Sequence, residues 1–113
     1  MATPAPISSA ALAHAVTNAL TAPDCACVVG RAAVATGACG SGLGDLTRAL
    51  LSTLELDAQS LTTAPAPALR ALLGANCRAD FAAGRTVLVD GWLLSRTEVT
   101  VSGIAHLYAD GST

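Results

Sequence analysis

A stretch near the C-terminus constrains the fold of this chain more than any other part of the sequence. Residues Thr86–Val89 are β-branched or apolar and predict a short strand. The pair Asp90-Gly91 is typical of a two-residue turn, from which the chain returns through Trp92–Leu94. Ser95–Glu98 reads SRTE and matches a capping box, in which a serine side chain accepts a hydrogen bond from the first turn of a helix. The segment therefore predicts a small hairpin followed directly by a helix.

The residues that follow this cap give conflicting signals. Val99 and Val101 favour a strand by propensity. The cap itself and the spacing of Ile104, Leu107 and Tyr108 favour a helix. We predict a helix here, with a strand as the alternative.

Further helices are predicted where leucine and other apolar residues recur every four positions. A possible short helix, Val28–Thr36, lies within the irregular stretch 24–44. The main predicted helices are residues 8–20 with a cap at Ser8 or Ser9, residues 45–56 with a cap at Asp45, and a third that begins at Pro67 and ends at Gly84.

The apolar content is mostly alanine, which limits how the domain can be stabilised. Hydrophobic residues make up 52% of the chain, but aromatic residues make up only 3%, and alanine buries little area. Such a chain needs close helix contacts, a partner subunit or cross-links. We therefore predict one mainly α domain over 8–110, with about four helices and at most one short β-strand or hairpin near 86–94. Residues 1–7 are predicted to be a flexible arm and 111–113 a tail.

Charge and hydropathy exclude several classes of function. The net charge is −2, and all six basic residues are arginine, so the basic patch expected of a nucleic-acid-binding protein is missing. No run of apolar residues approaches the length of a membrane span. The first residues, MATPAPISS, lack the pattern of a signal peptide. The lysine-free, alanine- and arginine-rich composition is typical of a GC-rich bacterial genome.

The block DFAAGRTVLVDGWLLSRTE, residues 80–98, resembles the C-terminal block of small bacterial proteins that carry a twin-arginine export signal and have no established activity. The resemblance implies export after folding and a periplasmic or secreted location; a cytoplasmic location is the alternative. The sequence departs from that pattern after Glu98, where VTVSG stands in place of the usual alanines and leucines.

Four cysteines are the main candidates for covalent chemistry: Cys25, Cys27, Cys39 and Cys77. In an exported protein they suggest two disulfides, with the connectivity open. The alternatives are buried free thiols, or a thiolate site for copper, zinc or an iron–sulfur cluster. The spacing matches no known paired ligand arms, so no cofactor is predicted.

Other polar groups give weaker indications of a site. The glycine-rich stretch 40–44 is similar to a phosphate-binding loop, but it lacks the preceding strand and the lysine, so a flexible loop is predicted. His14 is predicted to be an exposed helix residue. His106 lies at helical spacing from Asp110, which could orient it as a base. No nucleophile elbow or paired-carboxylate site is recognisable.

These observations favour interaction over catalysis. The sequence predicts a non-catalytic accessory subunit or interaction module of a larger, exported bacterial complex, with a protein partner or an oligomer as its context. A small metal or redox protein that uses Cys25 and Cys27 is the alternative, and an enzyme of unrecognised type is third. Ser95, Glu98 and Trp92 are predicted to be structural, with Trp92 buried against Phe81 or Leu107.

Overall fold

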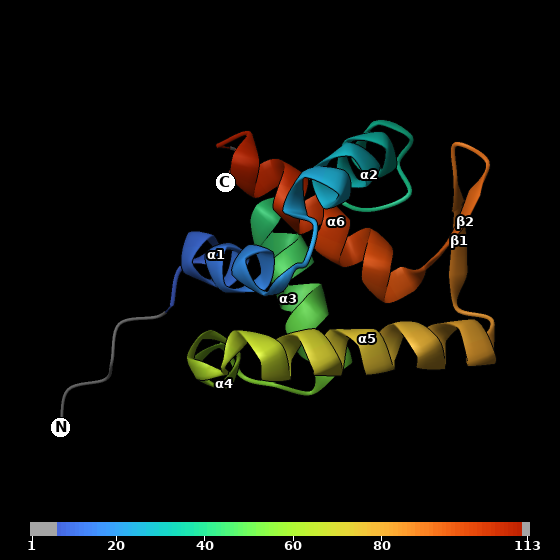
Figure 1. Ribbon diagram of the computed structural model, residues 1–113. Helices are drawn as coiled ribbons and strands as arrows, with labels where there is room; N and C mark the ends of the chain where they lie inside the picture. The colour runs from blue at the N-terminus through green and yellow to red at the C-terminus, as the bar shows by residue number, and fades with distance from the viewer. Residues whose placement is uncertain (1–6, 112–113) are drawn as a thin grey trace, which may run out of the picture.

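The C-terminal helix lies at the centre of the fold, and the other elements are arranged around it (Figure 1). The computed structural model describes residues 7–111, so most of the predicted arm 1–7 and tail 111–113 lies outside the described residues. The elements are α1 (Ser9–Ala19), α2 (Pro23–Ala35), α3 (Leu43–Leu54), α4 (Ala58–Thr63), α5 (Ala66–Ala83), β1 (Thr86–Val89), β2 (Trp92–Ser95) and α6 (Arg96–Ala109). The prediction of a mainly helical chain with one small hairpin is confirmed.

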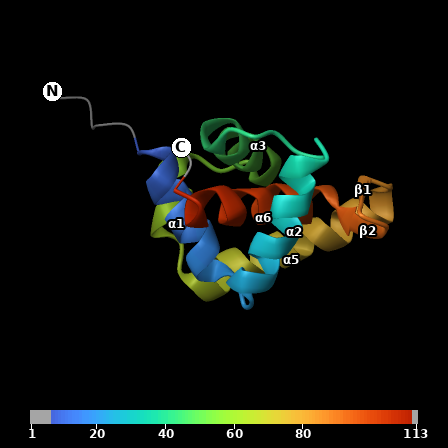
Figure 2. The same cartoon turned by 90° about the horizontal axis from the view of Figure 1, so that it is seen from above.

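Helix α6 is packed on several sides, which explains how its β-branched residues come to be helical. It contacts α1, α2, α3 and α5, and Figure 2 shows it running through the middle of the helical body. Val99, Val101 and Ile104 are all buried. Burial on several faces stabilises the helix by more than the small propensity cost of these residues. The helix predicted after Ser95 is confirmed, and the strand alternative is wrong.

The main core is built from leucine. It joins the inward faces of α1, α3, α4, α5 and α6 through Leu12, Val16, Leu43, Leu46, Leu50, Leu54, Leu61, Leu69, Leu73, Ile104 and Leu107. A second, smaller cluster joins α2, β1 and α6 through Ala33, Val89 and Val99. The hairpin is therefore anchored on the smaller cluster, at one end of the helical body (Figure 1).

Helices α2 and α6 cross at a very close approach. A methyl group built on Gly30 of α2 would lie 1.8 Å from the backbone oxygen of Ser102 on α6. Gly30 is therefore required for this crossing, although glycine normally weakens a helix interior. The small residues that allow close contact here serve packing within the chain.

Several predicted helix ends are confirmed. The Ser8 side chain accepts a hydrogen bond from the Ala11 amide and caps α1. Pro67 lies in the first turn of α5, and Gly84 ends that helix in the left-handed region at φ 76°. The Ser95 side chain accepts a hydrogen bond from the Glu98 amide at 3.0 Å and caps α6.

Other helix predictions are corrected by the structure. The described part of the chain has six helices instead of about four. Helix α2 begins at Pro23, five residues before the predicted Val28, because the proline suits a first turn. Helix α3 begins at Leu43 after Gly42, so Asp45 lies in its first turn and is not its cap. The short helix α4 was not predicted, although Asp57 caps it through the Ser60 amide.

The hairpin has the predicted turn. Strands β1 and β2 are antiparallel, with Val89 opposite Trp92 and Leu88 opposite Leu93. Asp90 and Gly91 both have positive φ, 49° and 82°, as a type I′ turn requires. None of the helices in residues 7–111 is both long enough and apolar enough to cross a membrane.

Candidate functional site: an apolar groove between α2 and the hairpin

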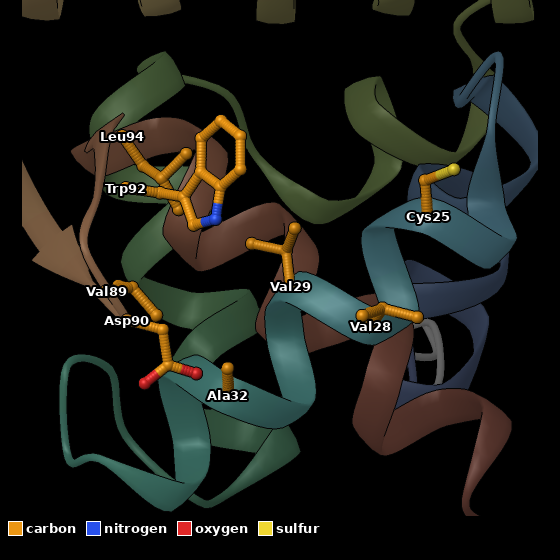
Figure 3. Close-up of a pocket in the computed structure, with 8 residues that line it drawn as sticks. All are labelled: Cys25, Val28, Val29, Ala32, Val89, Asp90, Trp92 and Leu94. Carbon is orange, nitrogen blue, oxygen red and sulfur yellow. The ribbon is translucent and has the colours of Figure 1, made fainter.

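An apolar groove of about 610 Å³ separates α2 from the hairpin (Figure 3). Its helical wall consists of Cys25, Val28, Val29 and Ala32, and its hairpin wall consists of Val89, Asp90, Trp92 and Leu94. The volume lies within the range of about 300–1,000 Å³ that is common for binding pockets.

The helical wall is a regular stripe. Its residues lie at positions i, i+3, i+4 and i+7 of α2, the spacing of one helix face. The face of α2 that carries Gly30 and Ala33 packs against the rest of the fold. The stripe is therefore a second apolar face of the same helix. Val28 on the stripe is 71% exposed. Cys25 is also exposed, whereas Val29 and Ala32 are half-buried, so the stripe is patterned for packing but is only partly covered.

The hairpin wall is one face of the two strands. Val89 and Trp92 are direct cross-strand partners, as are Val87 and Leu94, so all four side chains lie on the same face of the pleat. Val89 is buried against the second cluster. Trp92 lies opposite Val89 in the pair next to the turn, and its indole extends toward Val29 (Figure 3).

The prediction that Trp92 is buried is wrong. Its side chain is 73% exposed, and Phe81, a suggested neighbour, is 49% exposed. The physical reason is the position of the hairpin at the end of the helical body, where the leucine core does not reach it. The largest apolar side chain of the protein therefore lies on the surface, at the edge of a groove.

The opposite face of the hairpin is also exposed. Leu88 and Leu93 are cross-strand partners on that face, and their side chains are 68% and 59% exposed. They do not line the groove. They provide a comparison for the groove residues, since they are apolar side chains of the same hairpin on its other face.

A buried carboxylate fixes the base of the hairpin. Asp80, near the end of α5, accepts hydrogen bonds from the amide of Thr97 at 2.8 Å and from its hydroxyl at 2.7 Å. The Arg85 guanidinium adds an ion pair at 2.8 Å. Burial opposes ionisation of Asp80, but these hydrogen bonds and the nearby cation outweigh it and lower the pKa of the carboxyl. Asp80 thereby ties α5, the hairpin and the first turn of α6 together.

Sequence reasoning missed this role of Asp80. The predicted cap, Ser95, binds only one of the first amides of α6, and Asp80 binds another. The sequence signal available was the pair Asp80 and Arg85 on either side of the helix stop Gly84. That pair does not indicate that Thr97, seventeen residues after Asp80, is the main partner.

The four cysteines are unpaired in this structure, so the two predicted disulfides are not seen and stay a prediction. Cys25 is exposed and lines the groove. Burial raises the pKa of the half-buried thiols Cys39 and Cys77, and in Cys77 a hydrogen bond with Ser95 opposes the rise.

The Cys25-x-Cys27 pair does not converge on one point. Cys25 lies at the end of the helical wall of the groove, whereas the Cys27 thiol donates a hydrogen bond to the backbone oxygen of Ala105 on α6 at 3.4 Å. Burial, with the nearby Asp24, raises the pKa of Cys27. Within residues 7–111, no group of three or more histidine, cysteine, aspartate or glutamate side chains is arranged to hold a metal ion.

The two histidines lie on different parts of the surface. His14 is exposed, as predicted, and its Nδ1 lies 3.0 Å from the hydroxyl of Tyr108. His106 and Asp110 line a shallow hollow with Cys27 and Arg31. The stretch 40–44 was predicted to be a flexible loop, but its last two residues, Leu43 and Gly44, already belong to α3, and the element before it is the helix α2.

No family model, curated protein or solved structure matches this chain. The geometry of the groove is therefore the main basis for assigning a function.

Proposed function

We propose that this protein is a non-catalytic interaction module, an accessory subunit of a larger bacterial exported complex, which binds an apolar segment of a partner protein in the groove between α2 and the hairpin. The observation that carries this proposal is the exposed Trp92 beside the open stripe of α2. Tryptophan is among the residues that contribute most to binding at protein interfaces.

The arrangement of exposed apolar residues supports binding over a purely structural role. Single exposed apolar side chains are common on protein surfaces, whereas contiguous apolar patches mark interaction sites. Val28 and Trp92 stand on opposite walls of one groove, and each is more than two-thirds exposed. Leaving both in water forgoes burial free energy that an intramolecular contact would supply. A partner that fills the groove would recover it.

The export part of the proposal rests on other support. The block 80–98 resembles the C-terminal block of twin-arginine-exported bacterial proteins, and four cysteines are typical of a protein made for an oxidising compartment. The geometry of the groove favours neither an exported nor a cytoplasmic protein. Export and partner binding are therefore tested separately.

Affinity purification with matched variants tests the binding proposal. The tagged wild-type chain is compared with Val28→Ser/Trp92→Ser, which changes both walls of the groove, and with Leu88→Ser/Leu93→Ser, which removes two exposed apolar side chains from the other hairpin face. Any protein that co-purifies with the wild type is then purified and titrated against all three. Circular dichroism and melting temperature establish that each variant folds.

We expect the groove variant to bind the recovered partner at least about thirtyfold more weakly, since a central interface residue contributes about 2 kcal/mol or more. The Leu88→Ser/Leu93→Ser variant is expected to bind as the wild type does. Equal binding by the wild type and the groove variant, or loss of binding only in the Leu88→Ser/Leu93→Ser variant, would rule out the groove as the interface.

A further inference from the structure

One charged side chain stands in the otherwise apolar groove. Asp90, at the hairpin turn, is the only charged residue among those that line it, and its carboxylate points toward Ala32 at one end of the α2 stripe (Figure 3). Its carboxylate accepts no hydrogen bond and forms no ion pair with any group in residues 7–111. The carboxylate is therefore free to meet a group that a bound segment brings into the groove.

A partner that covers this carboxylate must replace the water around it. A carboxylate that loses water without gaining a partner is costly, and a positive group that donates hydrogen bonds offsets this cost. Trp92 lies on the same wall of the groove, and the face of an indole ring also attracts cations. An acidic residue at this place would be repelled, so the groove selects against acidic segments.

The helical wall indicates the shape of the bound segment. The stripe from Cys25 to Ala32 covers two helical turns, a length of about 10 Å. An apolar stripe at this spacing packs well against the apolar stripe of a second helix. The hairpin presents the flat face of its strands to the groove, so its wall offers side chains to the segment and no free strand edge.

We infer that the groove binds an amphipathic helix of the partner protein, with a lysine or arginine placed at the end of its apolar stripe beside Asp90. This inference rests on the proposed function and adds the chemistry of the partner segment. The apolar stripe supplies most of the affinity, and the cation fixes how the helix is placed along the groove.

Three designed peptides without tryptophan or tyrosine test this inference, so that Trp92 is the only indole that reports binding. The first carries leucines at i, i+3, i+4 and i+7 among alanines and glutamines, with one arginine a turn beyond the last leucine. The second has glutamate in place of that arginine. The third has the composition of the first with its leucines scattered around the helix. Each is titrated while Trp92 emission is followed.

We expect the arginine peptide to bind about twofold to fivefold more tightly than the glutamate peptide, the range of an exposed ion pair. The scattered peptide is expected to bind most weakly. The variant Asp90→Asn keeps a residue that tolerates positive φ and removes the charge, and it should abolish the preference for arginine. The matched variant Asp45→Asn, on the exposed surface of α3, should keep the preference.

The outcomes separate this inference from the proposed function. If arginine and glutamate peptides bind equally to the wild type, and both lose binding by calorimetry in Trp92→Ser, the groove binds apolar helices and the role of Asp90 is wrong. If the scattered peptide binds as well as the arginine peptide, the helical shape is wrong. If none of the peptides binds and Trp92 emission is unchanged, both the inference and the groove as a helix-binding site are overturned.

Discussion

At the scale of single residues, Asp80 and Trp92 have roles that differ from those expected of their residue types. An aspartate at the end of a helix is normally a solvated residue, yet Asp80 is buried and accepts two hydrogen bonds from Thr97. A tryptophan in a small domain is normally part of the core, yet Trp92 is exposed. Asp80 holds the hairpin to the helical body, and Trp92 lies exposed at the groove.

Replacement of Asp80 by asparagine should destabilise the fold by about 1.5–3 kcal/mol, the range for a hydrogen bond to a charged group. The side chain is 4% exposed, so solvent screens these contacts little. Chemical denaturation of the wild type and Asp80→Asn at neutral pH measures the difference. Equal stability would mean that Asp80 does not hold the first turn of α6.

The same residue predicts a pH dependence. The folded-state pKa of Asp80 is lowered below its unfolded value, which is about 3.9, so the folded state releases this proton more readily than the unfolded state. Its contribution is complete above the unfolded pKa and is lost as pH falls through the folded pKa. As the pH is lowered from neutral through the folded-state pKa of Asp80, the free energy of unfolding should therefore fall more for the wild type than for Asp80→Asn. Parallel stability curves over this range would contradict the assignment.

At the scale of elements, the sequence predicts turns and helix ends well wherever residues within a few positions determine the conformation. The turn at Asp90-Gly91 and the caps Ser8 and Ser95 form as predicted, because each depends on residues within a few positions. The start of α2 was predicted at Val28 instead of Pro23, because the first residues of the helix show no regular apolar spacing. Its open stripe could not be recognised, because only the position of the hairpin shows which face of α2 is left uncovered.

The close crossing of α2 and α6 predicts a strong effect of a small substitution. In Gly30→Ala the added methyl would meet the backbone oxygen of Ser102, and overpacking of this kind costs about 1–3 kcal/mol. Gly74→Ala on α5 is the matched control, because its methyl would meet only the flexible side chain of Arg78 at 3.5 Å. It should be neutral or stabilising, as alanine favours a helix interior. Similar melting temperatures for the two variants would contradict this crossing.

At the scale of the whole molecule, a leucine core holds five helices, and a smaller cluster connects α2 and the hairpin at one end. The sequence indicated the fold class and the hairpin, but it did not indicate that the groove lies where these two parts meet. The groove depends on how residues 25–32 and 89–94 are placed relative to each other, which no local pattern encodes. For the same reason the sequence could not show which cysteines are accessible.

Thiol reactivity should differ among the four cysteines of the reduced protein. Cys25 is exposed, whereas the other three are partly buried and have raised pKa values, and the thiolate is the reactive form. Limited alkylation followed by peptide mass analysis should therefore detect modification of Cys25 first. Equal rates at all four positions would contradict their placement.

Export has its own test in the oxidation state of these cysteines. Protein isolated from an oxidising compartment is expected to contain two disulfides and no stoichiometric metal. Intact mass with and without alkylation, together with elemental analysis, measures both. Four alkylatable thiols without metal would instead support a cytoplasmic protein, and metal lost on Cys25→Ser or Cys27→Ser would support the thiolate alternative.

The central claim is that Trp92 lies in an open groove that a partner helix fills. Because Trp92 is the only tryptophan of the chain, its fluorescence emission reports directly on this groove. We expect the free, monomeric protein to emit as a water-exposed indole, and the emission to shift to shorter wavelength when the arginine-bearing amphipathic peptide is added. Emission typical of a buried indole in the free monomer, unchanged by the peptide, would contradict the claim.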